Sequence, residues 1–324
     1  ALAPNSRVMA VIKADGYGHG IARMARIFDA ADAFAVAAIE EAVTIREAGI
    51  GKPIVLLEGP FEAAELELVH ALDLEVVVHN HEQLDMLVGA PKPRVLWLKF
   101  DTGMHRLGFA LEHAKEAIAR ARALDIPLRF MTHFANTHHR GDASVHAQMD
   151  RFEQLLACEA GERSLANSGA VLGYQRAHGD WVRPGLMLYG VSPFDHEVGA
   201  DLGLLPVMTL RSRLISVRQV RAGEAVGYGG AYVCPQDMPV GVLAYGYGDG
   251  YPRHAQTGTP ILVRGIRTQV IGHCSMDMMT VDLRPVPDAC FGDFGTLWGE
   301  GLPIEEVARA SGTIPYELLC RVRM

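Results

Sequence analysis

The chain has 324 residues and a formal net charge of −8, with 49% hydrophobic and 21% charged residues. This composition supports a sizeable core and excludes a mostly disordered chain, and the absence of a basic stripe argues against nucleic-acid binding. The apolar runs are shorter than the roughly 20 residues of a membrane-spanning helix, and no signal peptide is visible.

The five cysteines are odd in number and show no CxxC spacing. This usage is typical of a reducing cytoplasm and argues against a disulfide framework or a structural zinc site. Because the sequence opens almost directly on a strand-like run, we expect further residues to precede it.

Up to about residue 190, short apolar runs alternate with segments rich in the helix-favouring residues Ala, Glu, Arg and Leu. Eight strands with intervening helices favour a (β/α)8 barrel, although periodicity alone also allows a doubly wound open sheet. The expected strands are Arg7–Ile12, Phe34–Ile39, Ile54–Glu58, Glu75–His79, Arg94–Lys99, Leu128–Phe134, Ser164–Ala166 and Trp181–Tyr189.

Polar residues stand at or near the ends of these runs, where the active sites of barrels are built. They are Lys13, Lys99, His133, Ser168 and Arg183. This convergence favours the barrel over the open sheet.

After about Pro206 the pattern changes to alternating residues and glycine-rich turns, with one helix expected late, at Pro303–Ala310. This sequence pattern predicts a separate, mainly β domain. We therefore expect a barrel domain over residues 1–205 and a β domain over residues 206–324.

The run Val8–Gly20 is an apolar stretch that ends in a lysine, followed by a segment with several glycines. An amine at the end of a buried strand is partly desolvated, which favours the neutral form that condenses with an aldehyde, and glycines admit a close ligand. By itself the run also fits a solvated lysine before a turn. The whole run resembles the pyridoxal 5'-phosphate (PLP) attachment segment of bacterial alanine racemases, which are barrel-type enzymes. The resemblance implies that Lys13 carries the cofactor and that Tyr17 reaches its phosphate.

The run Leu98–Gly108 is a second match. Taken alone it fits a strand, a turn and a solvated arginine. It resembles the racemase stretch in which a lysine is carbamylated, which implies this modification at Lys99. The resemblance also assigns Arg106 to the substrate carboxylate, a task that suits a bidentate guanidinium.

The run Met131–Asn136 ends the sixth expected strand, and the resemblance places His133 close to the cofactor ring. His138 and His139 follow, and with a carbamylated Lys99 they invite comparison with the metal sites of some barrel hydrolases. Those sites also need a His-x-His pair on the first strand, which this chain lacks. We therefore expect no metal.

Loops after the seventh and eighth strands of a barrel commonly bind phosphate. Two runs in these places, Leu165–Gly169 and Arg183–Leu186, match the family. The cofactor-binding residues that the resemblance implies here are Asn167, Ser168, Gly185 and Leu186, with the Ser168 hydroxyl and the backbones of Gly185 and Leu186 at the phosphate.

The resemblance places Arg183 against the pyridine nitrogen. Because arginine does not give up its proton, the nitrogen stays neutral and the ring is a weaker electron sink, which suppresses transamination. Some family members carry a histidine where Ser164 stands, so a hydrogen bond from that histidine cannot be transferred to this chain.

In the second domain, Tyr228 lies among glycines, which by itself is most typical of a turn. The resemblance makes it the second catalytic base, Tyr247 a residue that narrows the entrance, and the Met276 backbone N–H a contact of the substrate carboxylate. In the family these residues enter the site of the partner subunit, which implies a homodimer with composite sites.

The resemblance covers nearly the whole chain through at least six motifs. It implies a cytoplasmic, PLP-dependent alanine racemase that uses Lys13 and Tyr228 and serves peptidoglycan synthesis or alanine catabolism. Three alternatives remain: a broad-specificity racemase on the same fold, a PLP-dependent amino-acid decarboxylase, and a non-catalytic PLP carrier. A decarboxylase should show a glycine-rich phosphate loop and a catalytic cysteine, and a carrier should lack the second domain.

Overall fold

The computed structural model describes residues 2–322, which form two compact units. The first unit contains residues 2–188 and 193–195, and the second contains residues 189–192 and 196–322. The expected domain limit between residues 205 and 206 stays a prediction. No helix within residues 2–322 is both long enough and apolar enough to cross a membrane.

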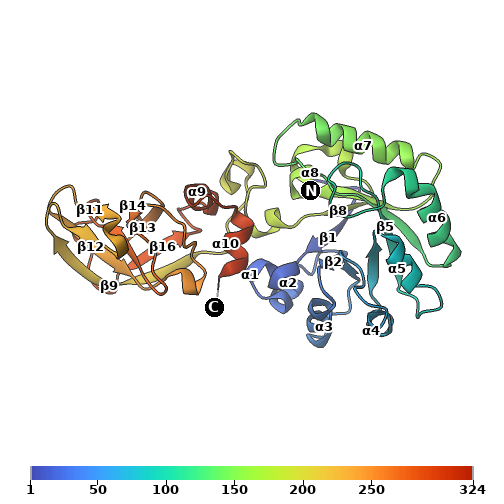
Figure 1. The fold of residues 1–324 in the computed structure, drawn as a ribbon, viewed down its shortest axis with the longest axis horizontal. Coiled ribbons are helices and arrows are strands. Elements are labelled where there is room, and N and C mark those ends of the chain that lie inside the picture. The colour runs from blue at the N-terminus through green and yellow to red at the C-terminus, as the bar shows by residue number, and fades with distance from the viewer. Residues whose placement is uncertain (1, 323–324) are drawn as a thin grey trace. The chain divides into compact units, whose positions relative to one another are not determined.

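The first unit is a closed barrel of eight parallel strands (Figure 1). Strand β1 pairs with β2 on one side and with β8 on the other, so the (β/α)8 barrel is confirmed and the open sheet is excluded. The strands are β1 (Arg7–Val11), β2 (Ala33–Val36), β3 (Ile54–Leu56), β4 (Glu75–Val78), β5 (Val95–Lys99), β6 (Leu128–Met131), β7 (Arg163–Asn167) and β8 (Trp181–Arg183).

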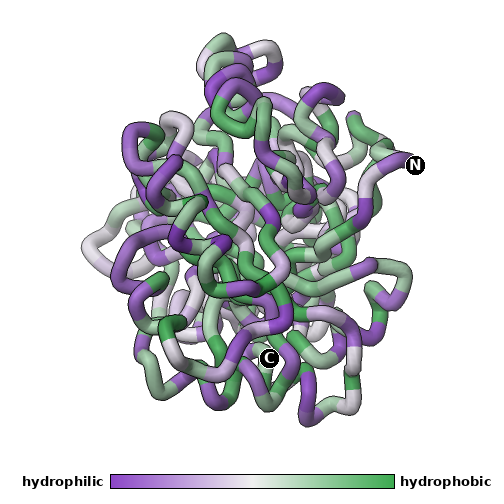
Figure 2. The backbone as a smooth tube through the Cα atoms, turned by 90° about the vertical axis from the view of Figure 1, so that its right-hand side faces the viewer, coloured by the Kyte–Doolittle hydropathy of each residue, from purple (hydrophilic) through white to green (hydrophobic). Residues whose placement is uncertain are grey.

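Helices cover the outside of this barrel (Figure 1). Their buried residues are largely apolar, and many outer turns of the backbone are hydrophilic (Figure 2). They are α2 (Ile21–Ile27), α3 (Ile39–Glu47), α4 (Glu65–Ala71), α5 (His81–Met86), α6 (Ala114–Ala123), α7 (Ala143–Leu155) and α8 (Ser168–Gly173). The short segment α1 (Lys13–Gly18) after β1 has left-handed backbone angles.

The eighth strand is shorter than the sequence predicted. It was expected to run to Tyr189 but ends at Arg183, because Pro184 has no N–H to offer a neighbouring strand. The chain then turns into a short 3₁₀ helix, η3 (Leu186–Tyr189). The early end of β8 lets a loop follow Arg183 at the rim of the barrel.

The second unit is a closed barrel of six antiparallel strands in the order β12-β15-β14-β13-β16-β9, with a separate two-stranded ribbon, so the mainly β prediction is confirmed. Two helices follow the strands, of which only the first was expected. The elements are β9 (Leu210–Val220), β10 (Ala225–Val226), β11 (Tyr232–Val233), β12 (Met238–Leu243), β13 (Pro260–Val263), β14 (Ile266–Ile271), β15 (Met279–Asp282), β16 (Phe294–Trp298), α9 (Ile304–Ala310) and α10 (Pro315–Arg321).

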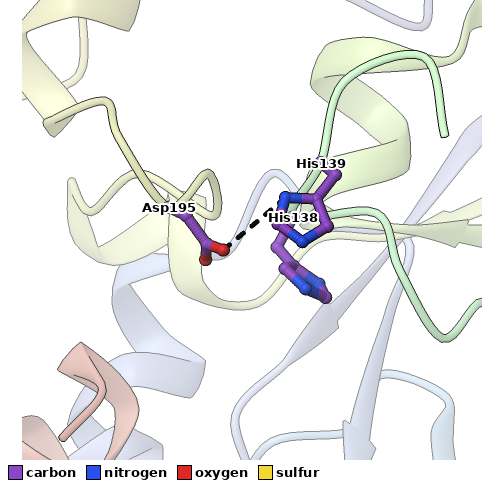
Figure 3. Close-up of side chains that lie close together, drawn as sticks. All are labelled: His138, His139 and Asp195. Atoms are coloured by element: carbon purple, nitrogen blue, oxygen red, sulfur yellow. Dashed lines mark ion pairs between the residues drawn. The ribbon is translucent and has the colours of Figure 1, made fainter.

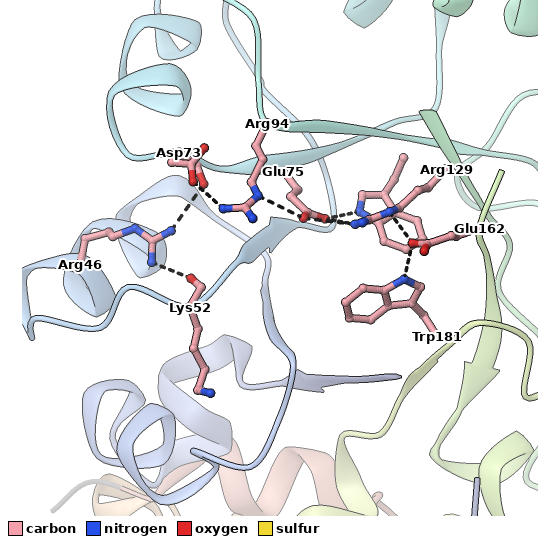
Figure 4. Close-up of polar contacts among 9 residues, drawn as sticks. Arg46, Lys52, Asp73, Glu75, Arg94, Arg129, Glu162 and Trp181 are labelled. Carbon is pink, nitrogen blue, oxygen red and sulfur yellow. Dashed lines mark hydrogen bonds and ion pairs between the residues drawn. The ribbon is translucent and has the colours of Figure 1, made fainter. Parts of the chain in front are cut away.

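A polar network ties together strand starts at the amino end of the first barrel (Figure 4). The buried Glu75 carboxylate accepts hydrogen bonds from Trp97 Nε1 at 2.7 Å and from Arg129 Nη1 at 3.0 Å. Glu162 contacts Arg129 Nε at 2.7 Å and accepts a hydrogen bond from Trp181 Nε1 at 2.9 Å. Active sites of barrels lie at the opposite end, so this network serves stability.

Candidate active site

The polar residues singled out in the first unit lie at the carboxyl ends of the barrel strands. Lys13 comes two residues after β1, Lys99 is the last residue of β5, and Arg183 is the last residue of β8. His133 comes two residues after β6, and Ser168 directly follows β7. Since carboxyl ends of parallel strands share one edge of a barrel, these side chains come from five strands to the same rim.

The segment after Lys13 is a left-handed turn. The φ angles of Ala14, Asp15, Gly16 and Tyr17 are 54°, 52°, 64° and 52°. This conformation costs roughly 1–2 kcal/mol for each residue that carries a Cβ. The Glu41 carboxylate offsets the cost, since its Oε1 accepts a hydrogen bond from Ala14 N at 2.6 Å and its Oε2 accepts one from Ala37 N at 2.8 Å.

Positive charge accumulates around Lys99, which is buried. Burial, reinforced by the positive charges of Arg183, Arg106 and Lys13 and opposed by the Glu58 carboxylate, lowers the pKa of Lys99 to about 8. Burial and the same cations lower the pKa of His133 well below its ordinary value. A site with this electrostatic balance favours anionic molecules.

Arg183 is buried and held from several sides. Its Nη1 donates to Ser164 Oγ at 2.6 Å, and its Nη2 donates to the Thr132 carbonyl at 2.7 Å and lies 3.3 Å from His133 Nδ1. Burial lowers the pKa of Arg183 to about 10, so the guanidinium remains protonated at neutral pH. Ser164 in turn donates to the Trp181 carbonyl at 3.0 Å, so this serine links Arg183 to the sheet.

Hydrogen bonds join the segments that follow β7 and β8. Ser168 Oγ accepts hydrogen bonds from Gly185 N at 2.9 Å and from Met187 N at 3.4 Å. A Cβ added at Gly185 would lie 2.6 Å from the Tyr17 hydroxyl, so only glycine allows this approach. Asn167 Oδ1 accepts the Ala170 N–H at 3.1 Å and shapes the start of α8. The result is a cradle of hydroxyl and backbone N–H groups, and the buried Leu186 continues it.

The three residues expected from the second unit are partly or largely exposed. Tyr247 and Met276 lie together, since Gly248 N donates to the Met276 carbonyl at 2.7 Å and Tyr247 N donates to the Ser275 carbonyl at 3.0 Å. Tyr228 is 76% exposed and lines a hollow of about 400 Å³ together with Ser275. The structure therefore brings Tyr228 and the segment of Met276 to one region of the second unit.

Three supporting contacts were not predicted from the sequence. Glu41 holds the left-handed turn, Ser164 holds Arg183, and Gln148 holds the loop of His133. Only Gln148 had a local signal, because it occupies the buried face of α7 with Val145 and Met149, where an apolar residue is typical.

A lysine after β1, a cradle between β7 and β8 and a cluster of cations define a (β/α)8-barrel enzyme that works with an anionic molecule. Residues 1–193 match the model of the alanine racemase N-terminal domain, and residues 207–324 match that of the alanine racemase C-terminal domain. The chain belongs to the alanine racemase family and is an amino-acid racemase.

Individual relatives agree with this assignment. The alanine racemase of Nitrosococcus oceani is 52% identical over 99% of this chain and 91% of its own length, and that of Aeromonas hydrophila is 50% identical with the same coverage. The crystal structure of biosynthetic alanine racemase from Pseudomonas aeruginosa superposes with a TM-score of 0.96 at 44% identity, covering 99% of this chain and 91% of that one. The similarity does not favour a decarboxylase or a broad-specificity racemase.

A further solved relative holds a cofactor. It is the alanine racemase of Bartonella henselae with covalently bound pyridoxal phosphate, with a TM-score of 0.89 and 27% identity over 100% of this chain and 92% of that one.

Proposed function

We propose that this alanine racemase holds PLP through Lys13 and completes its site with Tyr228 from a second copy of the chain. The observation that carries the cofactor assignment is the donor set of the barrel rim. PLP bears a phosphate, an acidic ring hydroxyl and an aldehyde. The rim offers the Lys13 amine and three further cations, Lys99, Arg106 and Arg183. It also offers the cradle, in which only glycine fits at residue 185. The residues present therefore fit the cofactor.

Each rim residue has a role that follows from its contacts. Ser168, Gly185, Leu186 and Tyr17 would hold the phosphate, with Asn167 shaping their turn. Arg183, fixed by Ser164 and the Thr132 carbonyl, would face the pyridine nitrogen beside His133. When bound, PLP supplies an electron-withdrawing ring that acidifies the α-carbon of alanine. A permanently protonated Arg183 cannot pass a proton to the ring nitrogen, which limits this effect and favours racemisation over transamination.

Racemisation needs proton donors and acceptors on both faces of the α-carbon. Lys13 would serve one face, and Tyr228 would serve the other from the partner chain. The 76% exposure of Tyr228 supports this role, because a catalytic tyrosine that acts on another subunit must be accessible before assembly. The proposed assembly is a homodimer with two composite sites, in which Tyr247 and Met276 also enter the partner's site.

Arg106 would bind the substrate carboxylate, and a modified Lys99 would hold Arg106 in place. A buried lysine with a pKa of about 8 has an appreciable neutral fraction at neutral pH, and a neutral amine adds to carbon dioxide with loss of one proton. The resulting carbamate would be an anion among the cations Arg106, Arg183 and Lys13. We propose that it pairs with Arg106 and fixes that exposed side chain.

A spectrum followed by a chiral assay tests the function. The purified protein should be yellow, borohydride should fix the label on the peptide that contains Lys13, and L-alanine should yield D-alanine faster than other L-amino acids react. A colourless protein that does not take up added PLP contradicts the cofactor assignment. Equal rates with many amino acids would contradict alanine as the preferred substrate.

The biological setting belongs to the same proposal. D-Alanine from this reaction would supply peptidoglycan, or the enzyme would serve alanine catabolism. A cytoplasmic location is supported by the five cysteines, all of which lie in the described residues as free thiols.

A further inference from the structure

Two histidines and an aspartate meet at the rim of the first unit (Figure 3). His138 and His139 lie in the loop between β6 and α7, and Asp195 lies in the segment after β8. One ligand atom from each residue lies within 4.8 Å of the other two, and His139 Nδ1 is 3.6 Å from Asp195 Oδ2. We propose that these three side chains form a binding site for a divalent transition metal, outside the proposed catalytic site.

The spacing suits a metal after small side-chain rotations. Zinc lies about 2.0–2.1 Å from histidine nitrogen and about 2.0–2.2 Å from carboxylate oxygen, so tetrahedral ligand atoms are roughly 3.4 Å apart. The His139–Asp195 pair is already close to that value. Two imidazoles and one carboxylate favour zinc, nickel or copper over magnesium or calcium, and water would complete the coordination.

The backbone that carries the ligands is held in place from both sides. The Asp195 N–H donates to the His138 carbonyl at 3.4 Å, which joins the two segments directly. The Arg140 guanidinium lies 3.8 Å from the centre of the Phe194 ring. Tyr174 donates its hydroxyl proton to the His139 carbonyl at 2.5 Å. These contacts therefore hold the backbone of the ligand residues in a fixed arrangement.

Charge and access also favour a cation. His139 and Asp195 are about half exposed, with side-chain exposures of 53% and 47%, so a metal can enter from solvent. Asp142 is a second nearby carboxylate, whose pKa is lowered by hydrogen bonds from Ser144 and by the charges of His139 and His138. The Arg140 guanidinium, a nearby cation, contacts the Phe194 ring.

This site differs from a metal site centred on a carbamylated Lys99, for which the first strand lacks a His-x-His pair. Asp195 joins the two histidines only through the fold, 56 positions beyond His139. A simpler interpretation is an isolated histidine–aspartate ion pair. His105 and Asp101 form such a pair at 3.3 Å, so they provide a matched control.

The site adjoins the cradle between β7 and β8. Thr137, which precedes His138, donates from its Oγ1 to Asn167 Oδ1 at 2.9 Å. A Cβ added at Gly169 would lie 2.7 Å from the Thr137 carbonyl oxygen, so the two segments are in close contact. A bound metal should therefore reduce local opening of the turn at Asn167, which hydrogen exchange at the Ala170 amide can report.

Calorimetric titration of the full-length holoprotein with zinc ions alone tests the proposal, after alkylation of the exposed thiols of Cys158, Cys290 and Cys320. We expect one equivalent of zinc to bind. His139→Gln and Asp195→Asn should each weaken binding at least about tenfold, since each removes one of three ligands. His105→Gln should bind like the unmodified chain.

Two further measurements make the outcome decisive. Zinc should raise the thermal midpoint of the wild-type protein and of His105→Gln, because a ligand that binds only the folded state stabilises it. In a His139→Gln/Asp195→Asn variant, zinc should neither raise the thermal midpoint nor slow hydrogen exchange at the Ala170 amide. Unchanged zinc binding by a folded form of that double variant would overturn the proposal, and so would loss of binding in His105→Gln. Neither result depends on racemase activity.

Discussion

Gln148 holds the loop of His133, since its Nε2 donates a hydrogen bond to the His133 carbonyl at 3.1 Å. The same amide group donates to Thr102 Oγ1 at 3.2 Å, and its Oε1 accepts the Ala135 N–H at 3.1 Å. One buried side chain of α7 therefore fixes the loop after β6 against the loop that leads to Arg106.

Replacing Gln148 should weaken both stability and catalysis. Gln148→Leu keeps the size but leaves the Ala135 N–H without its partner, which costs about 1–3 kcal/mol for a buried group. We expect a corresponding loss in the free energy of unfolding, measured with urea, and a lower kcat for L-alanine. Gln154→Leu, on the exposed side of the same helix, is the control and should change the free energy of unfolding by less than about 0.5 kcal/mol. Equal effects of the two changes would contradict the role of Gln148.

The buried Lys99 should make stability depend on alkaline pH. Its pKa falls from 10.5 in the unfolded chain to about 8 in the fold, so between these values the unfolded state binds more protons. Stability should then rise with pH across this window, by on the order of 3 kcal/mol in total. Lys99→Met should lack the rise, which urea denaturation from pH 7 to 11 in carbonate-free buffer can measure.

Bicarbonate provides the second half of this experiment. A carbamylated Lys99 no longer has an amine that titrates in this range, so added bicarbonate should flatten the rise. An equal slope for wild type and Lys99→Met without bicarbonate would show that other groups cause the pH dependence.

Mixed dimers test the proposed composite site. Lys13→Ala and Tyr228→Phe should each be nearly inactive, while a hybrid of the two contains one site with both residues intact. In an equimolar mixture half of the dimers are hybrids with one of two sites intact, so about a quarter of wild-type activity should return. Because Tyr228 is largely exposed, Tyr228→Phe should fold normally and retain PLP. Absence of recovery after verified subunit exchange would place both bases in one chain.

The network at the amino end of the barrel should affect stability without altering the chemistry. Glu75→Gln removes the charge that meets Arg129 in a buried setting, and breaking such a pair costs about 3 kcal/mol. We expect a lower urea midpoint but a normal PLP spectrum and a normal KM for alanine. The exposed Glu82→Gln serves as the control. A change in KM with Glu75→Gln would show that the two ends of the barrel are coupled.

The sequence by itself determined the eight strands of the first unit, because strands buried on both faces must be short apolar runs, here separated by helix-favouring segments. It also placed Lys13, Lys99, His133, Ser168 and Arg183 at or near strand ends. The parallel order of the strands then brings these residues to one rim. The alternating pattern after Pro206 likewise predicted a β domain.

Only the tertiary structure decided which residues support the site. Glu41, Gln148 and Ser164 act on partners that lie 15 to 27 positions away, in the contacts Gln148–His133, Ser164–Arg183 and Glu41–Ala14. Asp195 meets His139 across a still longer separation. Local patterns record burial and backbone preference over a few residues. A hydrogen bond or ion pair between distant segments depends on strand register and loop path, which are fixed only when the barrel closes.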